Sequence, residues 1–190
     1  LLAGDRPARL SIPVPSRGIN ASVHYQDMNG SGTTDILWVD VSGAAEGAWQ
    51  YLELFPKGRA GLLRKIDNGL GKMTTIEYEP AALGAARARD EKRPWTSRLN
   101  TAMPVVRRVS IDTSLNDPVR KTEFDHRQGT WDPNERCLAG FGQAIERSIA
   151  DPSTPTLVTD TTYDVGLVDR ILRGQPISIE QRDESAHLFS

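Results

Sequence analysis

Oxygen-bearing side chains recur at a regular spacing in one short loop, residues 27–35. The loop reads Asp-Met-Asn-Gly-Ser-Gly-Thr-Thr-Asp and places oxygen atoms at loop positions 1, 3, 5 and 9. Hard cations such as Ca²⁺ bind roughly six to eight oxygens, and a tightly wound loop directs alternate residues inward. Glycines at loop positions 4 and 6 permit the tight turn. The spacing predicts a calcium site formed by Asp27, Asn29, Ser31, Thr33 (through its carbonyl) and Asp35.

This loop is not an EF-hand, because Trp38 stands where that motif carries a bidentate glutamate. A purely structural turn built by Asn29 and its flanking glycines remains the alternative. The form D-x-N-G-x-G-x-x-D, followed by an apolar strand, resembles the FG-GAP calcium loops of integrin-type β-propellers. That family usually has Asp or Asn at the fifth position, where this sequence has Ser31. Only one such loop is present, and a propeller needs roughly four to eight blades, so this chain cannot close one by itself.

Other residues that could do chemistry do not form a recognisable catalytic pattern. Asp125, His126, Asp132 and Glu135 lie close in sequence, but in a strand Asp125 and His126 point to opposite faces. No Walker, Rossmann or nucleophile-elbow motif occurs. We therefore expect no enzymatic activity. An alternative is a sugar-stacking surface formed by the four tryptophans Trp38, Trp49, Trp95 and Trp131. In all-β chains, however, aromatic side chains more commonly pack within the sheets.

Composition narrows the class of protein further. The 190 residues are 38% hydrophobic and 25% charged, which is typical of a globular chain. No apolar stretch approaches the roughly 18 residues of a membrane span, and no secretory signal is visible. The single cysteine, Cys137, excludes an internal disulfide and a multi-thiolate zinc site. A net charge of −2 argues against general nucleic-acid binding.

The charges form three zones along the sequence. Residues 1–56 hold 3 basic and 6 acidic side chains, residues 57–108 hold 12 and 5, and residues 109–190 hold 8 and 14. The basic middle zone is expected to face an acidic surface of the same molecule or of a partner, with Arg64, Lys65, Arg107 and Arg108 as its test residues.

Strands dominate the predicted secondary structure. Residues 73–79 alternate apolar and polar side chains, and residues 105–112 and 119–125 flank a turn as a hairpin. Residues 81–93, rich in Ala and Arg, are expected to be a mobile loop with a partial helix, and residues 165–172 a short helix. Further strands are expected at residues 8–14, 21–25, 35–41, 49–55, 62–66, 142–149, 157–164 and 176–182. The chain is predicted to be all-β.

Three phrases carry a resemblance to a known family over nearly the whole chain. Residues 61–78 read GLLRKIDNGLGKMTTIEY, residues 131–142 read WDPNERCLAGFG, and residues 166–176 read GLVDRILRGQP. In order and spacing they resemble the middle region of the B component of bacterial Tc toxin complexes and its relatives, the Salmonella virulence plasmid protein B and Rhs-type toxins. The sequence departs from this pattern at residues 137–139 and at residues 81–95.

The resemblance implies an architecture and a function. Residues 1–56 would be the end of an FG-GAP-type β-propeller, and residues 57–190 would be curved antiparallel sheet of an Rhs/Tc-type shell. Such a shell encloses a toxic effector and docks on a pore-forming partner. The implied partners are other parts of a larger toxin polypeptide, a C-type effector component and an A-type pore component, and the implied location is extracellular. Two alternatives are the scaffold of a virulence protein with a separate ADP-ribosyltransferase domain, and a carbohydrate- or adhesion-binding propeller fragment.

Overall fold

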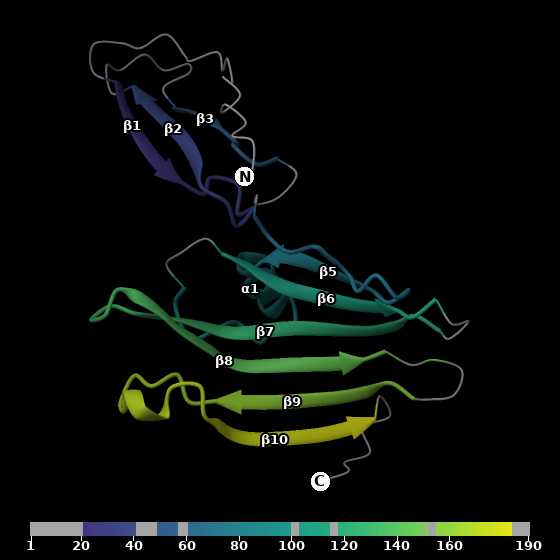
Figure 1. Ribbon diagram of the computed structural model, residues 1–190. Coiled ribbons are helices and arrows are strands. Elements are labelled where there is room, and N and C mark those ends of the chain that lie inside the picture. Colours follow the sequence, from purple (N-terminus) through teal and green to yellow (C-terminus); the bar gives the residue numbers. More distant parts are fainter. Residues whose placement is uncertain are drawn as a thin grey trace.

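A computed structural model describes residues 21–40, 49–56, 61–99, 103–114, 118–149, 151 and 155–183. These residues form a three-stranded sheet, a seven-stranded sheet and one α-helix (Figure 1). The strand expected at residues 8–14 lies outside the described part of the chain. Both sheets are entirely antiparallel, in agreement with the predicted strand-rich fold.

The small sheet consists of β1 (Ala21–Gln26), β2 (Asp35–Asp40) and β3 (Trp49–Leu52), with β2 in the centre. Leu37 on β2 is only 4% exposed, while Tyr25 on β1 and Trp49 on β3 are largely exposed. Residues 27–34, which contain most of the predicted calcium loop, connect β1 directly to β2. The loop is therefore held by the two strands that it joins.

The large sheet is a meander in which each strand pairs with its neighbours in sequence. β4 (Lys65–Asp67) and β5 (Met73–Pro80) form the predicted hairpin around residues 67–69. Then follow β6 (Pro104–Asp112), β7 (Arg120–Asp132), β8 (Cys137–Ser148), β9 (Leu157–Tyr163) and β10 (Pro176–Asp183). Among the described residues β4 and β10 are the edges, and neither sheet closes on itself. A propeller is thus not visible in this part of the chain.

Helix α1 (Ala81–Asp90) differs from the expectation of a mobile loop with a partial helix, because all ten residues are helical. The helix lies on one face of the large sheet and packs against β5 and β7 (Figure 1). Ala81 and Ala88 are 3% and 1% exposed, and Gly84 lies so close to β7 that a Cβ there would stand 3.3 Å from the carbonyl oxygen of His126. The small side chains, which bury little area each, instead permit a close approach of helix and sheet.

The second expected helix is reduced to a single 3₁₀ turn, η1 (Arg170–Leu172), within the β9–β10 connection. Asp169 caps this turn by accepting a hydrogen bond from the backbone N–H of Ile171. Across the described residues, no helix has the length and apolar character needed to cross a membrane.

Candidate functional site

The loop between β1 and β2 winds around its own acidic side chains. The Asp27 carboxylate accepts hydrogen bonds from the backbone N–H groups of Ser31 at 3.0 Å and Gly32 at 2.9 Å. Asn29 Oδ1 accepts another from Ser31 N–H, and the Ser31 and Thr33 hydroxyls lie 2.8 Å apart. Gly30 and Gly32 have φ angles of 72° and 82°, as the tight turn requires. The sequence-predicted ligand residues are thus gathered in one compact loop.

Asp35 differs from the other loop residues because one of its oxygens is unused. Its side chain is fully buried, at 0% exposure. Oδ2 accepts a hydrogen bond from Met28 N–H at 3.0 Å, whereas Oδ1 has no partner. Among the described residues no group of three or more His, Cys, Asp or Glu side chains could hold a metal, so a cation here would depend also on amide, hydroxyl and carbonyl oxygens.

The loop also touches the large sheet. The backbone of Gly32 packs against that of Pro80, at the end of β5, and Met103, just before β6. A Cβ at position 32 would lie 3.4 Å from Pro80 Cα and 3.3 Å from the Met103 carbonyl carbon. The predicted ligand loop is therefore a point of contact between the two sheets.

Two of the three family-like phrases meet at one end of the large sheet. Arg173, from the third phrase, pairs with Asp132 at 2.8 Å and with Glu135 at 3.0 Å, both from the second phrase. Arg170 pairs with Glu135 at 2.7 Å. We call these four residues the ionic clasp. It ties the β9–β10 connection to the β7–β8 turn.

Asp132 serves both the clasp and the turn. Its Oδ1 accepts hydrogen bonds from the backbone N–H groups of Asn134 and Glu135, and its Oδ2 receives Arg173. The pKa of Asp132 is lowered, mainly by the Glu135 N–H, with the Asn134 N–H and Arg173 adding to the effect. The side chain is 5% exposed, so the charge is held by partners on every side.

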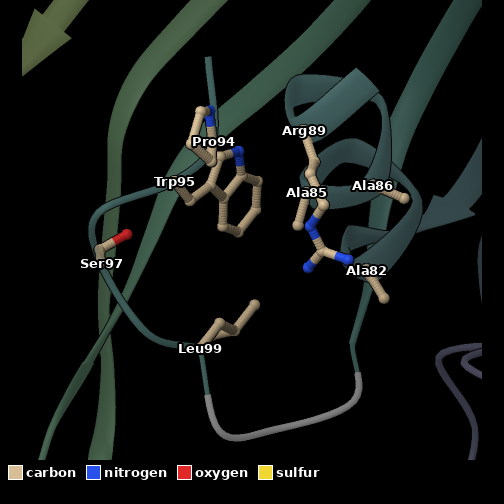
Figure 2. A pocket seen from close by; sticks show the side chains of 8 residues that line it. All are labelled: Ala82, Ala85, Ala86, Arg89, Pro94, Trp95, Ser97 and Leu99. Atoms are coloured by element: carbon tan, nitrogen blue, oxygen red, sulfur yellow. The ribbon is translucent and has the colours of Figure 1, made fainter. Parts of the chain in front are cut away.

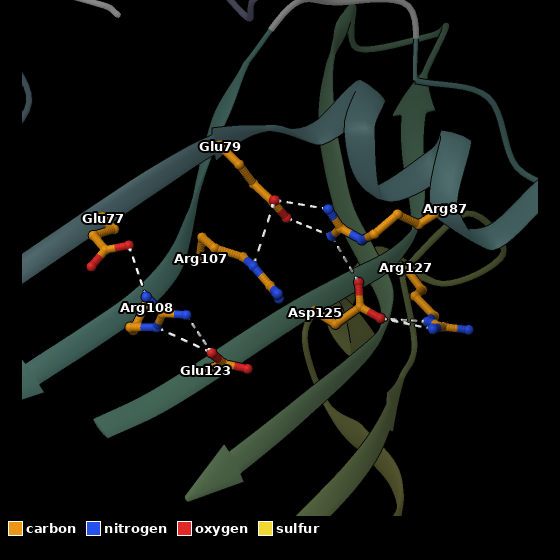
Figure 3. Close-up of polar contacts among 8 residues, drawn as sticks. All are labelled: Glu77, Glu79, Arg87, Arg107, Arg108, Glu123, Asp125 and Arg127. Atoms are coloured by element: carbon orange, nitrogen blue, oxygen red, sulfur yellow. Dashed lines mark hydrogen bonds and ion pairs between the residues drawn. The ribbon is translucent and has the colours of Figure 1, made fainter. Parts of the chain in front are cut away.

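A second ion-pair network holds α1 on the sheet (Figure 3). Arg87 on the helix binds both oxygens of Glu79 on β5, at 2.8 and 2.6 Å, and reaches Asp125 on β7 at 3.5 Å. Arg127 on β7 pairs with Asp125 at 2.8 Å and with Glu91, directly after the helix, at 2.7 Å. The C-terminal part of the helix is therefore tied to two strands by charged groups, a feature that no short-range pattern in the sequence reveals.

Three basic residues of the middle charge zone, Arg87, Arg107 and Arg108, pair with carboxylates of the large sheet. Arg108 pairs with Glu123 at 2.6 Å and Glu77 at 3.3 Å, and Arg107 lies 3.7 Å from Glu79. The Arg108 guanidinium lowers the pKa of Glu123. Arg107 and Arg108 were expected to face an acidic surface, and that surface is in part the neighbouring strands of the same sheet.

The acid–base residues do not form a catalytic constellation. Asp125 is committed to Arg127 and Arg87, and Asp132 to the clasp. His126 stacks near Phe141, with ring centroids 5.2 Å apart, and its Nδ1 has no hydrogen-bond partner. Burial lowers the pKa of His126, against the opposing effect of nearby Asp125 and Glu79, and so favours the neutral form of the ring.

The tryptophans are distributed over separate surfaces. Trp49 pairs with Val39 across the small sheet and so lies on the face opposite to Trp38. Trp95 packs edge-on against Phe141, with centroids 6.1 Å apart, above Gly129. A Cβ at Gly129 would come within 2.8 Å of the Trp95 ring, so only glycine permits this packing. Trp131 contributes to a different hollow, beside Pro133 and Leu167.

A pocket of about 400 Å³ lies between α1 and the segment that follows it (Figure 2). The helix supplies Ala82, Ala85, Ala86 and Arg89, which share one helical face at the spacing i, i+3, i+4, i+7. Across from them stand Pro94, Trp95, Ser97 and Leu99. A regular helix predicted at residues 81–90 would have placed these four residues on one face, so the helical wall of the pocket could have been recognised from the sequence.

Comparison with known proteins gives one family and one group of solved structures. Residues 3–171 match the family described as "Insecticide toxin TcdB middle/N-terminal region". A crystal structure of TcdB2-TccC3 is similar with a TM-score of 0.57 and 20% identity over 77% of this chain. A pore structure of the Photorhabdus luminescens Tc holotoxin is similar with a TM-score of 0.55 and 18% identity, also over 77%. A search of curated proteins found no match.

These solved chains are far longer than the present one. The matched region covers 7% of the chain in each of the two structures. At 18 to 20% identity the likeness shows the fold of this region.

Proposed function

Because this chain belongs to the family of the insecticide toxin TcdB middle/N-terminal region, we propose that it is a non-catalytic structural segment of a Tc-toxin B component. In this role it helps to form the shell that encloses a toxic effector, and to dock that shell on a pore-forming partner. Residues 1–56 would end a β-propeller and residues 57–190 would form shell sheet. The protein would act outside the cell that makes it.

The observation that carries this proposal is the open seven-stranded meander. Its described edges, β4 and β10, have no further strand beside them, and β10 exposes Ile177 at 66% and Ile179 at 56%. An open strand edge that carries exposed isoleucines is normally covered in a stable protein. Its charged side chains are bound to one another in ion-pair networks rather than gathered around a cleft, which suits a wall.

The size and contents of the native assembly test the proposal. An antibody against this chain would be used for an immunoblot of the source cells and to isolate the native polypeptide. We expect a band several times larger than 20.9 kDa, carrying an effector that resists added protease until the shell is denatured. A band of 20.9 kDa, or an effector that is digested at once, would contradict the proposal. Peptide sequencing of the isolated polypeptide would reveal an ADP-ribosyltransferase domain if the alternative scaffold role holds.

We also propose that the loop of residues 27–35 binds Ca²⁺. The support is the buried Asp35 Oδ1, because a fully buried carboxylate oxygen without a partner is costly unless a cation satisfies it. Asp27, Asn29, Ser31 and the Thr33 carbonyl supply the further oxygens. The cation would add rigidity at the contact between the two sheets.

Thermal unfolding in calcium and in a chelator tests this site. We expect Ca²⁺ to raise the melting temperature of the wild type, and Asp27→Ala and Asp35→Asn to remove that increment. Asp67→Ala is the matched control, since Asp67 likewise accepts a backbone N–H, that of Gly69, in the β4–β5 turn. Equal losses for Asp27→Ala with and without calcium would favour the purely structural turn.

A further inference from the structure

The pocket beside α1 is built from two unlike surfaces. The helix lines the pocket with Ala82, Ala85 and Ala86, whereas Ala81 and Ala88 are buried elsewhere on the helix. This alanine wall is flat and apolar. Opposite, Trp95 is fixed by its edge-on contact with Phe141, and its indole N–H is buried without a partner. Leu99 completes the apolar floor (Figure 2). A volume of about 400 Å³ is large enough for one or two big apolar side chains.

Arg89 is the charged residue that lines the pocket. Lys92 and Arg93 precede Pro94 at exposed positions, and the exposed Arg98 lies between Ser97 and Leu99 but lines the neighbouring hollow beside Trp131. Among the described residues none of these four has an ion-pair partner, in contrast to Arg87, Arg107 and Arg108. Two carboxylates, Asp90 and Glu91, follow Arg89 in the chain, and Glu91 is already bound to Arg127. Part of the unpaired charge of the basic zone therefore lies near this pocket.

We propose that this pocket is a docking site for an acidic peptide segment of a partner protein, with a leucine or phenylalanine that enters the pocket and carboxylates on both sides of it. The apolar walls accept the side chain, and the free cations pair with the flanking carboxylates. The inference does not rest on the shell function, because it concerns only residues 82–99.

The arrangement of the charges favours a peptide over other anions. A small carboxylate ligand would need one cation, whereas here Arg89 is followed by three more over nine residues. A nucleic acid would need a cationic track with stacking surfaces along it, but only one aromatic ring, Trp95, lines this pocket.

Binding of synthetic peptides to the 190-residue chain tests the proposal. The probe is a six-residue peptide with a central Leu-Phe flanked by two glutamates on each side, and affinity is measured by calorimetry. One matched peptide has lysines for the glutamates, and another has Ser-Ser for Leu-Phe. We expect binding of the first peptide only, weakened about tenfold by Arg89→Glu and by Ala86→Trp, which fills the pocket from an exposed position.

Two variants control for charge and bulk. Lys65→Glu reverses a charge on β4, and Leu83→Trp adds a large side chain to α1 outside the pocket. Both should leave the affinity within about twofold of the wild type. Circular dichroism checks that each variant folds; if Arg89→Glu does not, Arg89→Gln with a salt titration replaces it. The proposal is overturned if the serine or lysine peptide binds equally well, if Arg89→Glu and Ala86→Trp bind like the controls, or if a thymidine oligonucleotide displaces the peptide.

Discussion

At the residue scale, ion pairs in this protein differ in value according to burial. Asp125 and Arg127 are 7% and 8% exposed, and the other partner of Arg127, Glu91, is half exposed. Asp125→Ala would leave the buried guanidinium without its buried partner, so we expect the free energy of unfolding to fall by about 3 kcal/mol. Glu77→Ala, which removes an exposed partner of Arg108, should cost less than about 1 kcal/mol. Urea denaturation of both variants measures the two losses in the free energy of unfolding, and equal losses would contradict the dependence on burial.

His126 should make the stability depend on pH. Its pKa in the folded protein is lowered below the ordinary value of 6.5 by burial, while Asp125 and Glu79 act in the opposite direction. As the pH falls below 6.5, the unfolded histidine takes up a proton that the folded one does not, so stability is lost until the folded ring also titrates. We expect His126→Phe, which retains ring packing against Phe141, to lose part of this dependence in urea titrations between about pH 7.5 and 5. The exposed His24→Gln should retain it; identical slopes for all three proteins would contradict the assignment.

At the element scale, α1 ends in a conformation that its sequence does not favour. Arg93 N–H bonds to the Ala88 carbonyl and Lys92 N–H to the Arg89 carbonyl, which is the Schellman pattern, and Lys92 has φ 59° where glycine is usual. Lys92→Gly should therefore raise the free energy of unfolding by about 0.5 to 1 kcal/mol. Arg93→Gly, one residue later and without positive φ, should lower it. Thermal melts of the two variants give the comparison, and a loss in both would refute the capping argument.

The strands were predictable where alternation and turn residues agree. Residues 73–79 alternate and end at Pro80, and β5 has nearly those bounds. β7 extends seven residues past the predicted end, to Asp132. The sequence around Gly129 has no strand pattern of its own, and this part of β7 depends on packing with Trp95 and Phe141. Helix α1 was underestimated because its stability comes from Arg87 and Arg127 pairing across the fold, which local propensity does not register.

The candidate sites follow the same division between local and distant contacts. The compact turn of residues 27–35 was predictable because its polar residues are contiguous and its hydrogen bonds span at most seven residues, while calcium binding there stays a prediction. The ionic clasp joins residues 35 to 41 positions apart, and the pocket requires both α1 and Trp95. The second and third phrases contain the clasp residues, but their sequence alone does not show the pairing. The structure joins these two phrases through Arg173, which pairs with Asp132 and Glu135.

At the scale of the whole molecule, the apolar surface lies where sheet and loop would continue into a larger assembly. The clasp holds a connection whose apolar side chains face outward: Leu167 at 56%, Val168 at 102% and Ile171 at 85% exposure. The β10 edge, with Ile177 and Ile179, follows directly in the chain. Apolar residues of this number gathered on one part of a protein mark an interaction surface. An ion-paired support beneath them keeps that surface in shape before it is covered.

Hydrogen exchange can test whether this surface is covered in the native polypeptide. β8 is paired on both sides and should exchange slowly whether the 190-residue chain is alone or part of the larger polypeptide proposed above. Among the described residues β10 has one partner, β9, so under that proposal its outward amides should exchange fast in the isolated chain and slowly in the larger polypeptide, where another segment would cover them. The β4–β5 turn, with Leu70 90% exposed, provides an internal reference for exposed backbone. If β10 exchanges equally fast in both proteins, its edge is open in the assembly, and the exposed isoleucines need an explanation other than a continuous shell.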